Sequence, residues 1–480
     1  MTLRSLRPAD FAAFFAAVHG VQPFPWQDRL LHQVVDQGKW PQVLDLPTGT
    51  GKTAAIDSAV FHLALEASRG SERRAPVRIA YVVDRRLIVD DTYGRAYKLQ
   101  MALAQSTDPI VAAVASALRS LAGDHHQPAL LVRRLRGGAP REDDWARTPV
   151  QPTILCSTVD QVGSRLLFRG YGISDRMKPV QAGLLGSDCL LLLDEAHLAE
   201  PFRQMLQAMK HLRGADHAPW DVALLTATPG TGHEAQFHLE AADRVHPTLS
   251  SRLKVPKRAA LIELRAKRGY TEPENRIEAI AEQAKAAVQR LSTTIRHPAV
   301  GVVVNRVARA RAVFERLEQE LPEAQVMLVI GPARAIDREQ LAMTQLQPIR
   351  TGAERSLSRP FVVVATQTIE AGVDIDFDGL ITEAAALDAL RQRFGRLNRA
   401  GRPVAAEAVI VAHLEEVGPK ADDPVYGDRI AKTWEALKGV ANEASVDFGI
   451  ERRAFSIAIT ACAAKFCNSA ISFCEKGRTS

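Results

Sequence analysis

Short apolar runs alternate with longer, partly polar stretches along most of this chain. The runs form two series, at residues 42–46, 78–83, 153–157, 189–194 and 222–229, and then at 300–305, 325–330, 361–366 and 408–413. Val, Ile and Leu fill most of their positions without polar alternation, as in parallel strands covered on both faces. Helix-like segments such as 276–291 and 306–320 lie between them. Strand alternating with helix predicts an α/β fold, and two series predict two parallel sheets.

A polar and basic segment at 245–275 separates the two series, and Pro247 and Pro256 interrupt helix formation there. A second break at 414–426 combines proline with charge. The interval 100–150 holds a helical pattern and then an Arg- and Gly-rich stretch, which is typical of a surface insertion or of a loop that faces nucleic acid. We therefore expect a first domain at 1–250, a second at 251–415 and a short C-terminal extension at 416–480.

Composition narrows the class of protein. The chain has 480 residues, 46% hydrophobic and 24% charged, so it can bury globular cores. Its formal charge of +6 permits a nucleic-acid partner without requiring one. No stretch of about 18 uninterrupted apolar residues occurs, which predicts no membrane span. Five cysteines without a CxxC pair fit a reducing compartment better than a disulfide or zinc scaffold, so we expect a cytoplasmic protein.

The sequence LPTGTGKT at 46–53 follows the run QVLDL and precedes the helix-like TAAIDSAVFHLALEA. Gly49 and Gly51 would let the backbone wrap around phosphate oxygens, and the following helix start would add N–H groups. Lys52 would reach the β- and γ-phosphates, and the Thr53 hydroxyl would bind Mg²⁺. This context predicts ATP binding, through Thr48, Gly49, Thr50, Gly51, Lys52 and Thr53.

The sequence LLLLDEAH at 190–197 predicts the complement of that loop. Four leucines form a buried strand, and Asp194 follows at its C-terminal end, where open α/β sheets bind ligands. A carboxylate there can hold Mg²⁺, and Glu195 is placed to polarise the attacking water.

Taken in chain order, these motifs resemble those of superfamily 2 helicases over about residues 20–415. The further matching stretches are PFPWQ at 23–27, TATP at 226–229, TQTIEAGVDID at 366–376 and QRFGRLNRAGR at 392–402. They resemble the glutamine motif and motifs III, V and VI. The resemblance implies two tandem RecA-like parallel-sheet domains that hydrolyse ATP with Mg²⁺.

The resemblance also implies roles for single residues in the first half of the site. Gln27 would read the adenine edge, and Asp374 would contact the ATP ribose or merely cap a turn. His197, Thr226 and Thr228 would couple hydrolysis to movement.

Motif VI would supply the remaining catalytic groups. By resemblance, Gln392 would contact the phosphate or the water, and Arg396 and Arg399 would act as arginine fingers. Because Lys52 lies on the first sheet and these arginines follow the second, hydrolysis would require closure of the domains around a bound strand.

Several residues are candidates for holding the nucleic-acid backbone, because arginines and loop N–H groups bind phosphates without reading sequence. They are Arg85, Arg86, Gly137, Gly138, Thr158 and Thr366. Each could equally serve an ordinary surface or turn role. Trp145 could stack a base or pack in the core.

Three stretches narrow the resemblance to the type I CRISPR effector helicase, at 81–91, 156–162 and 362–401. PFPWQ and DPVYG, at 23–27 and 423–427, resemble the I-U (I-G) branch. This implies single-stranded DNA unwinding in CRISPR interference, an antiviral defence, with a Cascade-type surveillance complex as partner.

That family usually carries an HD nuclease, yet none of the 13 histidines here precedes an aspartate, and residues 455–480 differ in composition from the rest. We expect the nuclease to be a separate protein, or this chain to be truncated. Two other functions remain open: a general DEAH-type RNA or repair helicase, and a non-catalytic fragment that binds strands or the effector complex.

Overall fold

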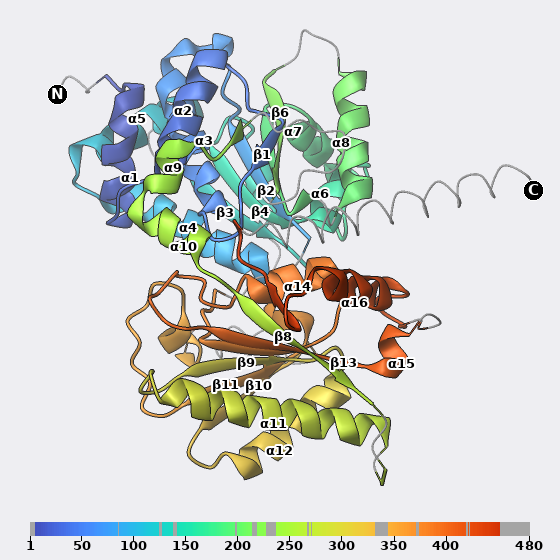
Figure 1. Cartoon of the computed structure of the whole chain (residues 1–480). Coiled ribbons are helices and arrows are strands. Elements are labelled where there is room, and N and C mark those ends of the chain that lie inside the picture. The colour runs from blue at the N-terminus through green and yellow to red at the C-terminus, as the bar shows by residue number, and fades with distance from the viewer. Residues whose placement is uncertain are drawn as a thin grey trace, which may run out of the picture. The chain divides into compact units, whose positions relative to one another are not determined.

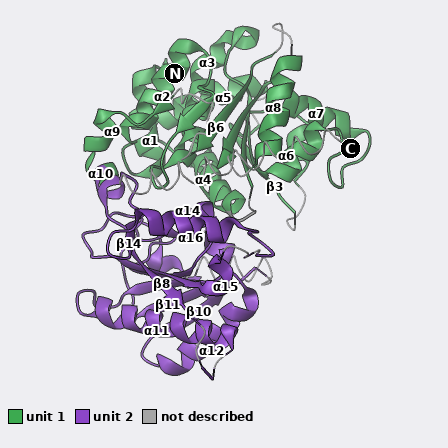
Figure 2. Cartoon of the chain, turned by 45° about the vertical axis from the view of Figure 1, so that its right-hand side comes forward, with its two compact units in different colours: residues 1–249 green, residues 250–480 purple. Residues whose placement is uncertain are grey.

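The protein divides into two compact units, residues 1–249 and 250–480 (Figure 2). The computed structural model describes residues 5–84, 86–123, 127–137, 142–196, 199–213, 218–226, 237–265, 268–269, 271–331, 344–370, 374–418, 421 and 423–451. The division falls within helix α10 (Pro247–Lys254), which begins at one predicted helix-breaking proline and ends before the other, Pro256.

The first unit is built on a seven-stranded sheet of order β3-β4-β2-β5-β6-β1-β7, in which every neighbouring pair is parallel. Its strands are β1 (Val43–Asp45), β2 (Arg78–Val83), β3 (Leu131–Leu135), β4 (Thr153–Thr158), β5 (Cys189–Asp194), β6 (Trp220–Thr226) and β7 (Phe237–His238). All six residues of β2, of β4 and of β5 are buried, as continuous apolar runs predict.

Helices cover both faces of this sheet. They are α1 (Phe11–His19), α2 (Pro25–Gln37), α3 (Ala55–Glu66), α4 (Arg86–Gln105), α5 (Pro109–Ala122), α6 (Val159–Leu166), α7 (Met177–Gly186), α8 (Glu200–Leu212) and α9 (Ala241–Val245). One core cluster packs α6, α7 and α8 against the strands. Figure 1 shows α1, α2, α3 and α5 on the other side of the sheet.

The second unit holds another seven-stranded sheet, of order β10-β11-β9-β12-β13-β8-β14. Its strands are β8 (Arg258–Leu264), β9 (Ala299–Val303), β10 (Gln325–Val329), β11 (Phe361–Ala365), β12 (Gly379–Glu383), β13 (Glu407–His413) and β14 (Ser445–Asp447). Only the edge strand β14 is antiparallel, where it pairs with β8. The two predicted parallel sheets are therefore confirmed.

The helices of the second unit also form two layers. They are α11 (Glu272–Ser292), α12 (Val307–Glu320), α14 (Leu387–Phe394), α15 (Leu414–Val417) and α16 (Arg429–Val440). A core cluster packs α11 and α12 against one face of the sheet, and Figure 1 shows α14 and α16 on its other side. Part of the predicted C-terminal extension, α16 and β14, thus belongs to this unit.

Five of the described strands lie where the sequence pattern gave no strand: β3, β7, β8, β12 and β14. The segment LVRRL forms β3 inside the predicted surface insertion, and RAALIEL forms β8 inside the predicted boundary segment. β3 lies at the edge of its sheet and pairs only with β4, so its arginines reach the surface and break the apolar pattern.

Among the described residues, no single helix is long and apolar enough to cross a membrane. Two consecutive helices, Ile88–Gln105 and Pro109–Ala122, are together long and apolar enough to do so, but a bend of 97° separates them.

Candidate nucleotide site and motif VI network

The glycine-rich loop leaves β1 and enters a short 3-10 turn, Lys52–Ala54, before α3 begins. Gly49 and Gly51 have φ of 85° and 80°, a left-handed backbone that favours glycine. The strand, loop and helix thus follow one another as the sequence predicted.

Helix α2 braces this loop from outside it. The Trp26 indole N–H donates to the Thr50 carbonyl at 3.0 Å, and the Gln27 amide donates to the Gly51 carbonyl at 3.4 Å. The Gln27 side-chain oxygen accepts from the Phe24 backbone N–H at 2.9 Å, so the Gln27 amide joins the start of α2 to the loop. Gln27 was predicted to read adenine, whereas Trp26, which precedes it in the PFPWQ motif, was given no role.

Lys52 brings the two predicted halves of the first site together. Its ammonium lies 2.9 Å from Glu195 Oε1 and 3.3 Å from Asp194 Oδ1, although Lys52 and Glu195 are 143 positions apart in the chain. Burial alone lowers the pKa of Lys52, but the two carboxylates outweigh it, and the net pKa is raised above its usual value. Lys52 is therefore a cation in this site.

The strand order explains this convergence. β6 lies between β5 and β1, and all three run parallel, so the loop after β1 and the acidic pair after β5 emerge at the same edge. Thr226 ends β6 between them, and its carbonyl accepts from the Leu46 N–H at 3.0 Å. The other two coupling candidates, His197 and Thr228, lie outside the described residues.

Asp194 is held from two directions. The Tyr81 hydroxyl donates to Oδ2 at 2.7 Å, and the Glu195 backbone N–H donates to Oδ1 at 2.9 Å. Burial, and then the Asp194 charge, raise the pKa of Tyr81 well above its usual value, so the phenol stays a donor. Sequence reasoning missed Tyr81; the one available signal was a hydroxyl inside an otherwise apolar strand, β2.

The residues present fit a magnesium–nucleotide group. Within the described ranges no three His, Cys, Asp or Glu side chains group as a metal site. Mg²⁺ in nucleotide sites usually takes one or two protein oxygens and completes its shell with phosphate and water. The Asp194 carboxylate and Thr53 hydroxyl are such donors, and the carboxylate pair already attracts one cation, Lys52.

In the second unit, motif VI is built around Arg393, which has no exposed surface. Its guanidinium pairs with the Glu370 carboxylate at 2.8 Å and donates to Thr382 Oγ1 at 2.8 Å. It also donates to Asn305 Oδ1 at 2.9 Å and to the Tyr426 hydroxyl at 3.4 Å. One arginine therefore joins β12 to segments that follow β9, β11 and β13.

The predicted finger residues, Arg396 and Arg399, follow this anchor in the chain. Arg396 donates to the Ile369 carbonyl at 3.1 Å and to the Glu370 carbonyl at 3.0 Å. The Arg399 guanidinium lies 3.6 Å from Asp374 Oδ1, and the side chains of both are partly exposed. The buried Oε1 atom of Gln392 has no hydrogen-bond partner among the described atoms.

Of the three aspartates at positions 374, 376 and 378, two make structural contacts within the second unit. Asp376 accepts from the Arg399 N–H at 2.6 Å and from Arg402 Nε at 2.8 Å, and Asp378 accepts from Arg402 at 2.6 Å. Both of these carboxylates are buried, whereas that of Asp374 is 32% exposed. Asp374 is thus the member of the block with surface to offer a ligand.

The residues predicted to bind the nucleic-acid strand lie on several separate elements. The side chains of Thr158, at the end of β4, and Thr366, just after β11, are buried, so contact there would fall to backbone groups. Gly137 lies two residues beyond β3, and Arg86 opens α4, while Arg85 and Gly138 lie outside the described ranges. Trp145 is buried in the core cluster, which favours its packing role.

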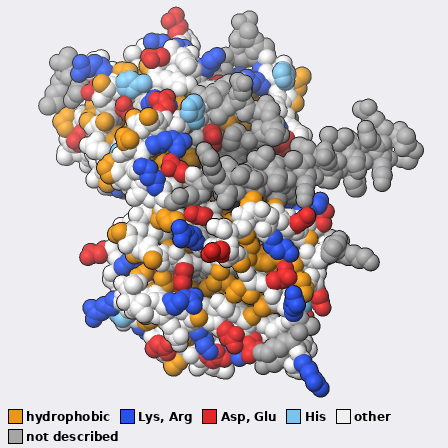
Figure 3. All heavy atoms as spheres, viewed as in Figure 1, with side chains coloured by type: hydrophobic (Ala, Val, Ile, Leu, Met, Phe, Trp, Pro, Cys, Tyr) orange, Lys and Arg blue, Asp and Glu red, His pale blue; other side chains and the backbone are white. Residues whose placement is uncertain are grey.

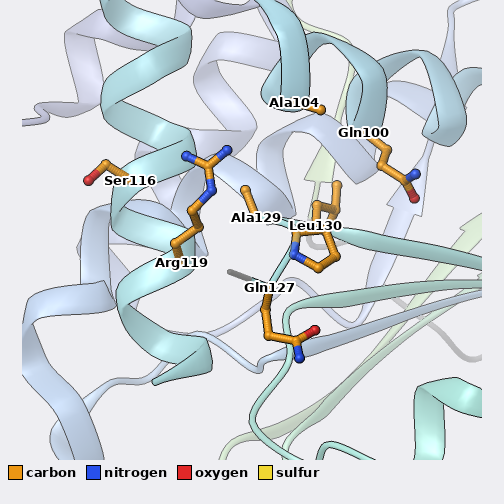
Figure 4. A pocket seen from close by; sticks show the side chains of 8 residues that line it. Gln100, Ala104, Ser116, Arg119, Gln127, Ala129 and Leu130 are labelled. Atoms are coloured by element: carbon orange, nitrogen blue, oxygen red, sulfur yellow. The ribbon is translucent and has the colours of Figure 1, made fainter. Parts of the chain in front are cut away.

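Neither surface charge nor the described pocket marks the site. Over the face in view in Figure 3, basic and acidic side chains of the described residues are interspersed. A pocket of about 480 Å³ lies between α4, α5 and the segment before β3 (Figure 4), lined by Gln100, Ala104, Ser116, Arg119, Gln127, Pro128, Ala129 and Leu130. None of the predicted site residues lines it.

Comparison with known proteins shows which proteins this chain resembles. Residues 296–402 match the family model for the C-terminal part of the CRISPR-associated nuclease/helicase Cas3. The Escherichia coli Cas3 endonuclease/helicase is 35% identical over 102 residues, 21% of this chain and 11% of that protein. A crystal structure of T. fusca Cas3 matches with a TM-score of 0.66 at 18% identity, covering 95% of this chain and 53% of the other. Residues 296–402 are thus similar in sequence to Cas3 proteins, and the chain as a whole is similar in fold to the helicase part of Cas3.

The two kinds of likeness cover different parts of the chain. The Cas3 family model falls on the second unit and includes Thr366, Asp374, Gln392, Arg396 and Arg399. The first unit is related to Cas3 by fold, through matches such as that to T. fusca Cas3 with ATP, with a TM-score of 0.65 at 18% identity. The chain spans about half the length of that protein, 53%.

Proposed function

We propose that this Cas3-type chain is an ATP-dependent single-stranded DNA translocase or helicase in type I CRISPR interference, unwinding target DNA for a nuclease supplied elsewhere. The observation that carries the proposal is the approach of Asp194 and Glu195 to Lys52, beside a loop whose glycines have left-handed backbones. A cation, two carboxylates and a hydroxyl at one sheet edge are the parts that phosphoryl transfer requires.

In the proposed reaction, Lys52 leaves its carboxylate partners and binds the β- and γ-phosphates, and Glu195 orients the attacking water. Mg²⁺, held by Thr53 and Asp194, would neutralise charge on the phosphate oxygens. Freed from Lys52, Glu195 gains the acceptor capacity that a water-positioning residue needs.

Arg396 and Arg399 are the proposed finger residues. The hydrogen bonds of the Arg396 guanidinium go to two neutral carbonyl oxygens, so its charge is available to a phosphate. Arg399 shares a partly exposed pair with Asp374, which a nucleotide could replace. Arginine fingers are worth about 10³–10⁵ in rate in comparable enzymes.

The pathway and the partner rest on relatives. One chain in a structure described as a CRISPR RNA-guided surveillance complex, pre-nicking, matches over 92% of this chain with a TM-score of 0.57. We infer that this chain also binds a Cascade-type complex, and that a separate HD nuclease cuts the unwound strand.

The decisive experiment is an ATPase assay of the full chain with single-stranded DNA, with RNA and with neither. We expect DNA to stimulate turnover and a strand-displacement assay to show unwinding. Stimulation by RNA alone would support a general RNA helicase instead. Strand binding without any ATP hydrolysis would support a non-catalytic fragment, and either result overturns the proposal.

A further inference from the structure

Tyr81 occupies an unusual position for a polar side chain. It lies inside β2, between β4 and β5, with Leu192 of β5 as its register partner, and only 1% of it is exposed. Its neighbours along the strand are apolar, so its hydroxyl must find an acceptor within the protein. The acceptor is Asp194, two residues beyond its register partner, at the end of β5.

The two oxygens of the Asp194 carboxylate have different partners. Oδ2 accepts from Tyr81 at 2.7 Å, while Oδ1 accepts from the Glu195 N–H at 2.9 Å and faces Lys52 at 3.3 Å. With both oxygens engaged, the carboxylate cannot rotate freely. Its orientation is therefore set before any ligand binds.

The same phenol also reaches the phosphate loop. The Thr53 side chain interacts with the Tyr81 oxygen and lowers its pKa, against the larger effects of burial and Asp194. Thr53 lies in the turn after β1, and Asp194 ends β5, so the two come from separate elements. Tyr81 links the two side chains that carry the oxygens proposed for Mg²⁺.

We propose that Tyr81 is a positioning residue for the magnesium site, which holds the Asp194 carboxylate in one orientation beside Lys52. The inference rests on the proposed ATPase function and gives a role to Tyr81, to which the sequence analysis of the stretch 81–91 assigned none. Mg²⁺ requires near-octahedral geometry at about 2.0–2.1 Å, so it tolerates poorly a carboxylate that turns.

The size of the effect follows from partners of metal ligands in other proteins. Removing a residue that orients a ligand typically costs about 10–100-fold in metal affinity. A purely structural tyrosine makes a different prediction, since losing its hydroxyl would lower the stability of the first unit and leave metal affinity unchanged.

The test is the Tyr81→Phe variant, which keeps the ring and removes the hydroxyl. Binding of a fluorescent ADP analogue is titrated with Mg²⁺, and again in excess EDTA, and bound Mn²⁺ is counted by electron paramagnetic resonance in the presence of ADP. We expect the Mg²⁺ requirement of ADP binding to rise about 10–100-fold. Metal-free ADP binding should change little, because the Tyr81 hydroxyl donates to Asp194, which is proposed to hold the metal and not the nucleotide.

Tyr97→Phe is the matched control, because Tyr97 is 43% exposed on α4 and stacks on Tyr93. It should titrate like the wild type. If Tyr81→Phe does not fold, Tyr81→His is measured in the same way. Its shorter ring donor cannot reach as far as the phenol, so Mg²⁺ affinity should still fall.

The outcomes separate the two proposals. A folded Tyr81 variant with the wild-type Mg²⁺ requirement overturns the positioning role. A wild-type protein that binds no ADP with or without Mg²⁺ overturns the ATPase function itself.

Discussion

Arg393 and Glu370 form an ion pair with a nitrogen–oxygen distance of 2.8 Å in the second unit, and neither side chain is more than 1% exposed. Glu370 follows β11 in motif V, and Arg393 lies in the motif VI helix α14. Burial lowers the pKa of Arg393, but Glu370 and Tyr426 outweigh it and raise the net pKa. Arg393 therefore keeps its charge, and its contact with Glu370 fixes the backbone to which Arg396 is hydrogen-bonded.

Breaking the Arg393–Glu370 ion pair should lower the free energy of unfolding of the second unit. Removing one partner of a buried ion pair costs about 3–5 kcal/mol, because the other charge stays buried without compensation. We expect Glu370→Gln to lower the free energy of unfolding by roughly this amount. The measurement is urea denaturation, followed by a spectroscopic signal that reports on the second unit.

The matched control is Glu407→Gln, which breaks the exposed Arg290–Glu407 pair in the same unit. Exposed pairs contribute about 0–1 kcal/mol, so this variant should denature almost like the wild type. Equal losses in the two variants would contradict the anchoring role of Arg393.

The catalytic assignments predict a graded loss of ATP hydrolysis. Removing one preorganised electrostatic group costs about 10²–10³ in turnover, and we expect at least that for Lys52→Ala and Glu195→Gln. Arg396→Ala should cost about 10³–10⁵, as loss of an arginine finger does. Turnover is measured by phosphate release at saturating ATP with single-stranded DNA.

Lys285→Ala serves as the control for these variants, because Lys285 pairs with Glu320 between α11 and α12, outside the motifs. It should leave turnover unchanged. Wild-type hydrolysis in Lys52→Ala or Glu195→Gln would refute the assignment of the nucleotide site.

The first unit should lose stability on mild acidification, because His62 is buried on α3 and its Nε2 atom has no hydrogen-bond partner among the described atoms. Burial lowers the pKa of His62 to about 4, despite the opposing effect of Glu66. As the pH falls from about 6.5 towards 4, His62 binds a proton in the unfolded chain but stays neutral in the folded chain. Stability is therefore lost across that window.

His62→Phe should flatten part of this pH dependence, because phenylalanine does not titrate. The measurement is the thermal midpoint of the first unit between pH 4 and 7 in both proteins. An identical slope in the variant would show that His62 does not titrate as its burial implies.

Gly301 tests the packing of the second sheet. A Cβ atom at this position in β9 would lie 2.6 Å from the ring of Phe377, which is fully buried. Overpacking of this kind costs about 1–3 kcal/mol, and we expect Gly301→Ala to lower the unfolding free energy accordingly.

The double variant Gly301→Ala with Phe377→Leu should lose less than the sum of its two single variants, because the smaller side chain makes room for the methyl group. Additive losses, measured by urea denaturation, would show that the two positions do not compete for space.

The sequence by itself determined the parts of this protein whose information is contiguous. Buried strands such as β5 can be recognised in the sequence as apolar runs. The loop that contains Lys52 can be recognised because a strand precedes it and a helix follows it. Phosphate binding also uses backbone N–H groups and glycines at fixed spacing, so its motif can be read without knowing the fold. The sheets, the loop and the acidic pair were predictable for that reason.

Only the tertiary structure decided which distant side chains meet. Tyr81 reaches Asp194 because β2 and β5 are neighbours in register, and Arg393 reaches Asn305 because β9 and β12 are. Strand order and register depend on how all the apolar surfaces pack at once, and no local pattern encodes them. A tyrosine in an apolar strand reads as core from sequence, and its neighbour across the sheet gives it a candidate role at the metal site.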